Sequence, residues 1–200
     1  MHPDIAFVPA ALPCAVLVVA CLALAGTMHV AWLRSPRSRA FAVPIDGGRH
    51  WRGRPVFGAN KTWRGLMAMP PAAAATFALA GLSRPLMPEG LAAGWWPLPS
   101  ATLALVGAIC GLAFMLAELP NSFLKRRLGV APGQPAAGPW LRPLCFLIDR
   151  FDSAIGVLLA LHLMLPLPAA AWGWALGIGA GLHWLFSVWL YHLRLKVRPG

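Results

Sequence analysis

Acidic residues are scarce in this chain: Asp and Glu together number 6 among 200 residues, against 17 Lys and Arg. Charged residues of both signs make up 12% of the sequence and hydrophobic residues 58%, whereas a soluble globular domain carries about 25% charged residues. This shortage of charge argues against an ordinary soluble domain. The composition predicts one integral membrane domain over residues 1–200, without a separate soluble module.

The motifs of several other protein classes are also missing. The four cysteines show no CxxC or Cys/His spacing, which argues against a zinc or redox site. Three of them lie inside apolar runs, and we expect these three to pack as small apolar side chains. The N-terminus lacks the basic segment of a signal peptide, so we expect a retained membrane helix there. There is no GxxxxGK[ST] loop, no Ser-His-Asp or Cys-His arrangement and no internal repeat.

Five apolar segments are long enough to cross a bilayer as helices, which takes about 20 residues. They cover about 7–33, 63–82, 101–119, 147–165 and 170–193. The expected fold class is therefore an all-α membrane protein with about five transmembrane helices. Pro70 and Pro71 predict a kink near the start of the second span. Trp95, Trp96 and Trp172 lie near span ends and suit an aromatic belt at the membrane interface.

The distribution of basic residues predicts the orientation. Every Lys and Arg except Arg84 lies in or beside the loops 34–62 and 120–146 or in the C-terminal tail. By the positive-inside rule these segments are cytoplasmic and the N-terminus lies outside. The basic residues, which give the chain a net charge of +11, then face anionic lipid or phosphates. We therefore expect no nucleic-acid partner. We expect a multi-pass protein of the cell (inner) membrane. A homodimer is a further expectation, because a second copy would add helix packing to a short bundle.

The first predicted loop carries a glycine-rich polar segment, Phe57-Gly-Ala-Asn-Lys-Thr-Trp-Arg-Gly65. Glycines let backbone amides approach an anion, and the start of a helix favours phosphate. The basic side chains here would also suit simple anchoring at the membrane surface. Anchoring requires no acid, amide or hydroxyl, however. We therefore favour a functional role over anchoring for Asp46, Asn60, Lys61 and Thr62.

A second polar stripe lies at the end of the third span. Glu118, Asn121, Ser122 and Lys125 share one face if this segment is helical. A helix cap and lipid-facing charge would be a simpler explanation of the same residues. A carboxylate at the end of an apolar span is costly, however, which favours a functional use.

Asp149 and Asp152, three residues apart, project from one face of a helix at the mouth of the fourth span. Ionisable groups in such a place are functional candidates, and carboxylate oxygens suit Mg²⁺ that is shared with substrate phosphates. A structural ion pair with Arg142 or Arg150 is the alternative.

These groups together suit phosphoryl chemistry. Acids hold Mg²⁺, and the cation and basic side chains neutralise a triphosphate. In-line attack by another phosphate oxygen needs positioning and charge stabilisation rather than a protein nucleophile. The membrane location points to a lipid-borne phosphate as the attacking group.

Three segments resemble the CDP-archaeol synthase family, which comprises membrane CTP:lipid-phosphate cytidylyltransferases related to CDP-diacylglycerol synthase. They are Phe57-Gly-Ala-Asn-Lys-Thr-Trp-Arg-Gly65, Ser122-Phe-Leu-Lys-Arg-Arg127 and Phe146-Leu-Ile-Asp-Arg-Phe-Asp-Ser153. The resemblance covers nearly the whole chain. It implies Mg²⁺-dependent transfer of CMP from CTP to a lipid phosphate, with release of pyrophosphate, at an active site on the cytoplasmic side.

The resemblance also implies roles for individual residues. It assigns catalysis to Lys125, Asp149 and Asp152, and it implies that Mg²⁺ is held by Asp149 and Asp152, with Glu118 as a further ligand. Contacts to the nucleotide or to the lipid phosphate would come from Asp46, Asn60, Lys61, Thr62, Arg64, Ser122, Arg126 and Ser153.

Two departures from the superfamily pattern Gly-Asp-x-x-Glu-Ser-x-x-Lys-Arg matter for the site. Glu118 stands where the pattern has Asp, and Asn121 where it has Glu, so the number of metal ions and the acceptor stay open. The Ala-, Arg- and Trp-rich composition is typical of a high-GC bacterium, for which archaeol would be an unusual acceptor. Phosphatidate or another lipid phosphate is the alternative to an archaeal-type ether lipid.

Two other functions remain as alternatives. A CTP-dependent lipid-alcohol kinase could use a similar site and would release CDP. A non-catalytic membrane protein that binds or transports anionic lipids could use the basic loops alone, but paired acids bind anions poorly without a cation.

Overall fold

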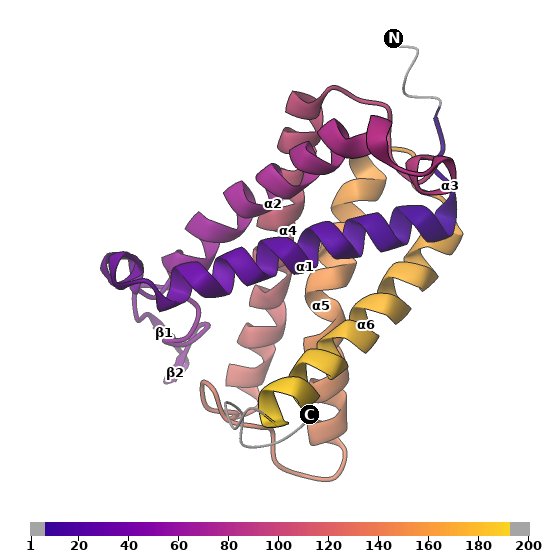
Figure 1. Cartoon of the computed structure of the whole chain (residues 1–200). Helices are drawn as coiled ribbons and strands as arrows, with labels where there is room; N and C mark the ends of the chain where they lie inside the picture. Colours follow the sequence, from indigo (N-terminus) through magenta and orange to yellow (C-terminus); the bar gives the residue numbers. More distant parts are fainter. Residues whose placement is uncertain (1–6, 193–200) are drawn as a thin grey trace.

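Helices account for nearly all regular structure in the computed structural model, which describes residues 7–192. The five long helices are α1 (Ala11–Arg34), α2 (Trp63–Ser83), α4 (Ser100–Arg127), α5 (Leu141–Met164) and α6 (Ala169–His192). Short elements join them: 3₁₀ turns η2 (Pro36–Phe41) and η3 (Arg84–Leu86), helix α3 (Glu89–Ala92), and a hairpin of β1 (His50–Trp51) and β2 (Arg54–Pro55). Figure 1 shows the hairpin near one end of α1 and α3 near the other.

The helical fold was predicted from the apolar segments. Helices α1, α2 and α6 match their predicted spans closely, whereas α4 ends later and α5 begins earlier than predicted. Among the residues whose side chains the structure describes, three segments are long and apolar enough to cross a membrane: Ala11–Arg34, Trp63–Leu86 and Ser100–Arg127. Helix α5 is not among them because its first turns carry four charged residues, and in α6 the part with described side chains, Ala169–Leu182, is apolar. The count of five spans and the orientation stay predictions. Residue 193 and the basic tail lie outside the described residues.

The second polar loop is shorter than predicted. Instead of spanning 120–146, it is confined to 128–140, because α4 continues to Arg127 and α5 begins at Leu141. Pro120 lies inside α4 without ending it. A proline in a helix removes one backbone N–H and therefore one intrahelical hydrogen bond, a loss that the remaining turns of a 28-residue helix tolerate. The polar stripe thus projects from a rigid helix rather than from a loop.

Helices α2 and α4 pack most extensively against each other, and two glycines on α4 make this possible. A Cβ atom added at Gly107 would lie 2.5 Å from the carbonyl oxygen of Ala73, and one added at Gly111 would lie 2.7 Å from that of Met69. Pro70 and Pro71 lie inside α2, which continues through them. Close approach of backbones through small residues is a common way for membrane helices to associate.

We expect Gly107→Ala to lower the free energy of unfolding by about 1–3 kcal/mol, because backbone atoms must move to admit the methyl group. Gly26→Ala is the matched control, since a Cβ at Gly26 of α1 would meet nothing within 4 Å. There the better helix propensity of alanine should leave stability unchanged or raise it by up to about 1 kcal/mol. Thermal unfolding in detergent measures both. A Gly107→Ala variant as stable as Gly26→Ala would contradict the packing argument.

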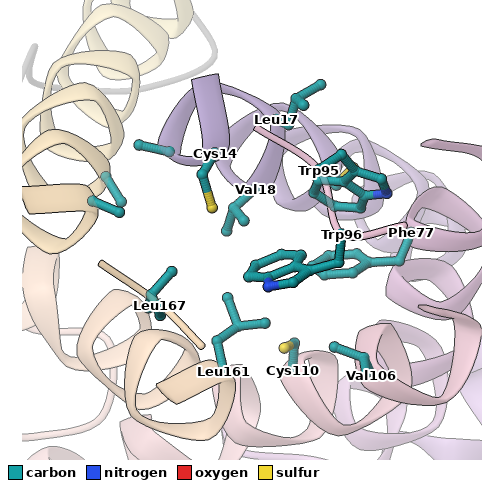
Figure 2. Packing of buried hydrophobic residues seen from close by; sticks show 14 of the residues in the cluster. Cys14, Leu17, Val18, Phe77, Trp95, Trp96, Val106, Cys110, Leu161 and Leu167 are labelled. Atoms are coloured by element: carbon teal, nitrogen blue, oxygen red, sulfur yellow. The ribbon is translucent and has the colours of Figure 1, made fainter. Parts of the chain in front are cut away.

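The largest buried cluster brings side chains of α1 together with side chains of α2, α4, α5 and α6 (Figure 2). Trp95 and Trp96 lie within it, 0% and 1% exposed, and the ring of Trp95 is 5.2 Å from that of Phe77. The prediction that these two tryptophans belong to an interfacial belt is therefore wrong. The segment before α4 turns into the bundle, where the large rings bury apolar surface, and the Nε1 of Trp96 donates to the carbonyl of Pro166 at 3.1 Å.

All four cysteines are free and buried, which confirms the packing expected for the three inside apolar runs and extends it to the fourth. The all-α expectation needs one addition, the two-stranded antiparallel hairpin in the first loop. An isolated bridge between Pro44 and Thr62 closes the base of this loop beside the start of α2. The loop is thereby held against the helices rather than being an unstructured connection.

Candidate active site

The polar residues of α4 and α5 meet where the C-terminal part of α4 packs on the N-terminal part of α5. Gly156 brings the two helices together here, because a Cβ at this position would lie 2.4 Å from the Cβ of Ala117 and 3.0 Å from the carbonyl oxygen of Ala113. Glu118, Asn121 and Lys125 are spaced at three and four residues along α4, so they share a face. On α5, Asp149, Asp152 and Ser153 turn toward them.

Asn121 lies between the two aspartates. Its Nδ2 is 2.6 Å from Oδ1 of Asp149 and 2.8 Å from Oδ2 of Asp152. Lys125 forms an ion pair with Asp149 that involves both carboxylate oxygens. Asp152 accepts from the backbone N–H and hydroxyl of Ser153 at 2.7 and 3.2 Å. The alternative pairing of Asp149 or Asp152 with Arg142 or Arg150 is not formed among the described residues.

Glu118 connects this cluster to the first loop. Its carboxylate forms an ion pair with Lys61, whose side chain is 19% exposed, and accepts a hydrogen bond from the hydroxyl of Ser153 at 3.0 Å. A continuous network therefore runs from Lys61 through Glu118, Ser153, Asp152, Asn121 and Asp149 to Lys125. We call these seven residues the site network.

The site network fits a hard divalent cation through the two aspartates. Carboxylate oxygens suit Mg²⁺, which is commonly bound by one or two carboxylates together with substrate phosphates. The ion pair with Lys125 shows that Asp149 presents a carboxylate to positive charge. Among the described residues, however, no three His, Cys, Asp or Glu side chains form a metal-binding group. Glu118, expected as a third ligand, instead lies with Lys61 and Ser153.

Asp46, predicted to contact the nucleotide, has its carboxylate turned to its own loop. It accepts from the backbone N–H groups of Gly48 at 2.9 Å, Phe57 at 2.8 Å and Gly58 at 3.1 Å. Burial acts to raise the pKa of Asp46, but these hydrogen bonds outweigh it and the pKa is lowered from its usual value. Asp46 thus shapes the loop that carries Asn60, which is exposed, and Lys61.

Because the pKa of Asp46 is lower in the folded state, its ionised form stabilises the fold above the unfolded-state pKa. This stabilisation is lost as the pH falls through the folded-state pKa. We expect Asp46→Asn to lower the free energy of unfolding near pH 7 by about 1–2 kcal/mol, since the amide is a weaker acceptor for three N–H groups. Thermal unfolding at pH 7 and at pH 3 measures this. A difference between variant and wild type that does not shrink at pH 3 would contradict it.

Three further residues that were predicted to bind phosphate have other surroundings. Arg64 donates to the carbonyl of Leu33 and to the hydroxyl of Ser38, so it ties α2 to the end of α1. Thr62 is the residue before α2, and its side chain makes no capping hydrogen bond. Ser122 is buried and its carbonyl accepts from Nε of Arg126 at 3.4 Å.

The three basic residues in a row at the end of α4 point in different directions, as a helix requires. Lys125 joins the site network, whereas Arg126 is 5% exposed and its Nη1 has no hydrogen-bond partner among the described residues. Arg127 donates to carbonyls of the hairpin, at Trp51, Arg54 and Pro55. In return, Arg54 donates to the last carbonyls of α4.

The sequence did not predict the reciprocal hydrogen bonds of Arg54 and Arg127 between the hairpin and α4, nor the contact of Asn121 with both aspartates. The contacts of Arg54 and Arg127 left no pattern in the sequence beyond a basic residue on each side. Asn121 did leave a signal: it falls on the same helical face as Glu118 and Lys125, which pointed toward the site before its contacts were known.

Comparison with known proteins places these features in a family, although no family model matches the chain. A CDP-archaeol synthase from Pyrococcus furiosus is 31% identical over 173 residues, which cover 82% of this chain and 88% of the relative. One from Methanosphaerula palustris is 35% identical over 140 residues, covering 67% and 73%. For one from Thermococcus onnurineus, 40% identical over 115 residues, the match covers 57% of this chain and 61% of the relative.

The fold has a solved counterpart. A structure described as an intramembrane enzyme for archaeal membrane lipids biosynthesis superimposes with a TM-score of 0.65, at 23% identity, over 91% of this chain and 98% of that one. Fold and apolar helices define a helical membrane protein with a carboxylate–lysine site at one end of its bundle. The chain belongs to the CDP-archaeol synthase family, a family of enzymes.

Proposed function

We propose that this protein is a membrane cytidylyltransferase that moves CMP from CTP to a lipid phosphate and yields a CDP-lipid and pyrophosphate. The observation that carries the proposal is the pair Asp149 and Asp152, joined by Asn121 and flanked by Lys125, in a chain whose relatives are named CDP-archaeol synthase. Apolar helices beside this polar cluster suit a substrate with one lipid and one charged end.

The reaction is an in-line displacement at phosphorus. An oxygen of the lipid phosphate attacks the α-phosphorus of CTP and forms a new P–O bond. The bond from the α-phosphorus to the oxygen bridging to the β-phosphorus breaks, and pyrophosphate leaves with the electron pair. Such a step needs positioning and charge stabilisation, for which no protein nucleophile is required.

The residues of the site network divide this work. Asp149 and Asp152 would hold Mg²⁺, which when bound supplies positive charge to the phosphate oxygens. Lys125 and Lys61 carry ammonium groups that neutralise phosphate charge once they turn from their carboxylates. Glu118 holds Lys61, and Asp46 shapes the loop from which Lys61 extends. Arg126, whose buried Nη1 has no partner within the described part of the chain, and Arg64, Asn60 and Thr62 remain candidates for contacts with substrate.

The location belongs to the same proposal. The predicted orientation puts the site network on the cytoplasmic side of the cell (inner) membrane, where CTP and Mg²⁺ are present. The acceptor is a lipid phosphate of archaeal ether type or a phosphatidate. These acceptors share the attacking group and differ only in the chains that the apolar helices would contact.

Product analysis tests the proposal. Purified protein is incubated with CTP, Mg²⁺ and, separately, a phosphorylated isoprenoid diether and phosphatidate, and the products are identified by mass spectrometry. We expect pyrophosphate and a CDP-lipid in equal amounts with at least one acceptor. Lipid alcohols serve as the competing substrates: release of CDP with them would identify a kinase, and no turnover with any substrate would leave only lipid binding or transport.

A further inference from the structure

Asn121 has an unusual place in the site network, because one amide group serves two carboxylates. The side chain is 8% exposed, and its Nδ2 lies within 2.8 Å of an oxygen of each aspartate. An amide NH₂ carries two N–H bonds, so each aspartate receives its own. Of the described side chains, that of Asn121 alone hydrogen-bonds to both Asp149 and Asp152.

The two aspartates need such a group because they lie three residues apart on one helix and repel each other. Lys125 offsets the charge of Asp149, and Ser153 donates to Asp152, but neither contact fixes one carboxylate relative to the other. A neutral amide does so without adding charge. Glutamate, which the superfamily pattern has at this position, would add a third negative charge and has no N–H to donate.

We propose that Asn121 is a positioning residue that directs the carboxylates of Asp149 and Asp152 toward one shared divalent cation. The inference rests on the proposed function for the cation's purpose, but not for its binding. Groups that hydrogen-bond to metal ligands fix the orientation of those ligands, and their loss typically costs 10–100-fold in metal affinity. Because Asn121 donates to both aspartates in the structure, the two carboxylates are held in a fixed relation to each other.

Binding of Mn²⁺ to the full-length protein in detergent, followed by electron paramagnetic resonance, tests this without any substrate. We expect Asn121→Leu, which fills the space but has no donor, to raise the Kd for Mn²⁺ about tenfold or more. Asn121→Gln, which keeps the NH₂ group, should stay within about threefold of wild type. Asn121→Ala is a second donor-free variant in case leucine prevents folding, and Thr76→Val, a buried polar position on α2, controls for lost stability.

Each outcome decides the inference. A donor-free variant that binds Mn²⁺ as tightly as wild type overturns it, as does wild-type protein that binds no Mn²⁺, or a Gln variant as weak as the donor-free ones. Pyrophosphate release is measured separately. If wild type releases pyrophosphate but the Kd for Mn²⁺ is the same in all variants at residue 121, the inference alone fails. If Mn²⁺ affinity follows the donor but no CDP-lipid forms with any acceptor, the proposed function alone fails.

Discussion

Asp149→Asn and Asp152→Asn are each expected to lower kcat/KM for CTP about a thousandfold. Each change removes a negatively charged oxygen from the pair that would hold the cation, and loss of cation-assisted charge stabilisation costs several kcal/mol, with each 1.4 kcal/mol worth tenfold in rate. Higher Mg²⁺ should recover part of the activity, because the defect lies in cation binding. Steady-state pyrophosphate release across a Mg²⁺ titration measures both effects.

The matched control for these variants is Glu89→Gln. It also converts an acid to its amide, but Glu89 is exposed on α3, away from the site network. This variant should retain wild-type kcat/KM. Full activity in both aspartate variants would contradict the assignment of the pair, and equal loss in the Glu89 control would show that total charge rather than the site matters.

Removing Lys61 should have the second largest effect. Lys61→Met is expected to lower kcat/KM about 100-fold, as for loss of a group that stabilises developing charge. Glu118→Gln should lower it about tenfold, because Glu118 acts by holding Lys61 in place. The double variant should be no worse than Lys61→Met alone, since coupled residues are not additive. A double-mutant cycle on kcat/KM measures the coupling.

The same cycle separates two roles for Glu118. If Glu118 orients Lys61, Glu118→Gln leaves the Mg²⁺ concentration needed for half-maximal activity unchanged. If it binds the cation, as the superfamily pattern implied, that concentration rises and the effects of the two substitutions multiply. Multiplying effects with a raised Mg²⁺ requirement would contradict the role that the ion pair with Lys61 indicates.

Much of the architecture was predictable because hydrophobic length determines where membrane helices form. The predicted segments 7–33 and 63–82 match α1 and α2 closely. Part of the site was also predictable, because residues spaced three or four apart share one face of a helix and meet the same neighbouring helix. Asp149, Asp152 and Lys125 were placed in one site from spacing and pattern, and the structure brings them together.

Contacts between distant segments were not predictable, because they depend on how the helices pack. Trp95 and Trp96, in a Gly- and Pro-flanked segment, resemble interfacial tryptophans until the segment is seen to fold inward. In the sequence Asp46 resembles a ligand-binding acid, but in the structure its carboxylate accepts hydrogen bonds from three backbone N–H groups. Glu118 could reach either a cation or a lysine, and its ion pair with Lys61 depends on how the first loop packs on α4; its role as a cation ligand stays a prediction. The homodimer and the membrane orientation stay predictions.

The paired lysines have a consequence for substrate binding. Lys125 and Lys61 each hold a carboxylate in the structure, so neither ammonium group is free. A cation on Asp149 would compete with Lys125 and release it toward an incoming phosphate. The protein should therefore bind CTP more tightly when the cation is present, and the cation more tightly when CTP is present.

Following labelled phosphorus from CTP into the lipid tests the central claim most directly. Wild-type protein is given CTP labelled at the α-phosphorus or at the γ-phosphorus, with Mg²⁺ and the accepted lipid phosphate, and the lipid phase is counted. Cytidylyl transfer predicts that the α-label enters the lipid and the γ-label leaves as pyrophosphate. Neither labelled lipid nor labelled pyrophosphate should accumulate with Asp152→Asn. A γ-label in the lipid, or an α-label that enters equally with Asp152→Asn, would contradict the account.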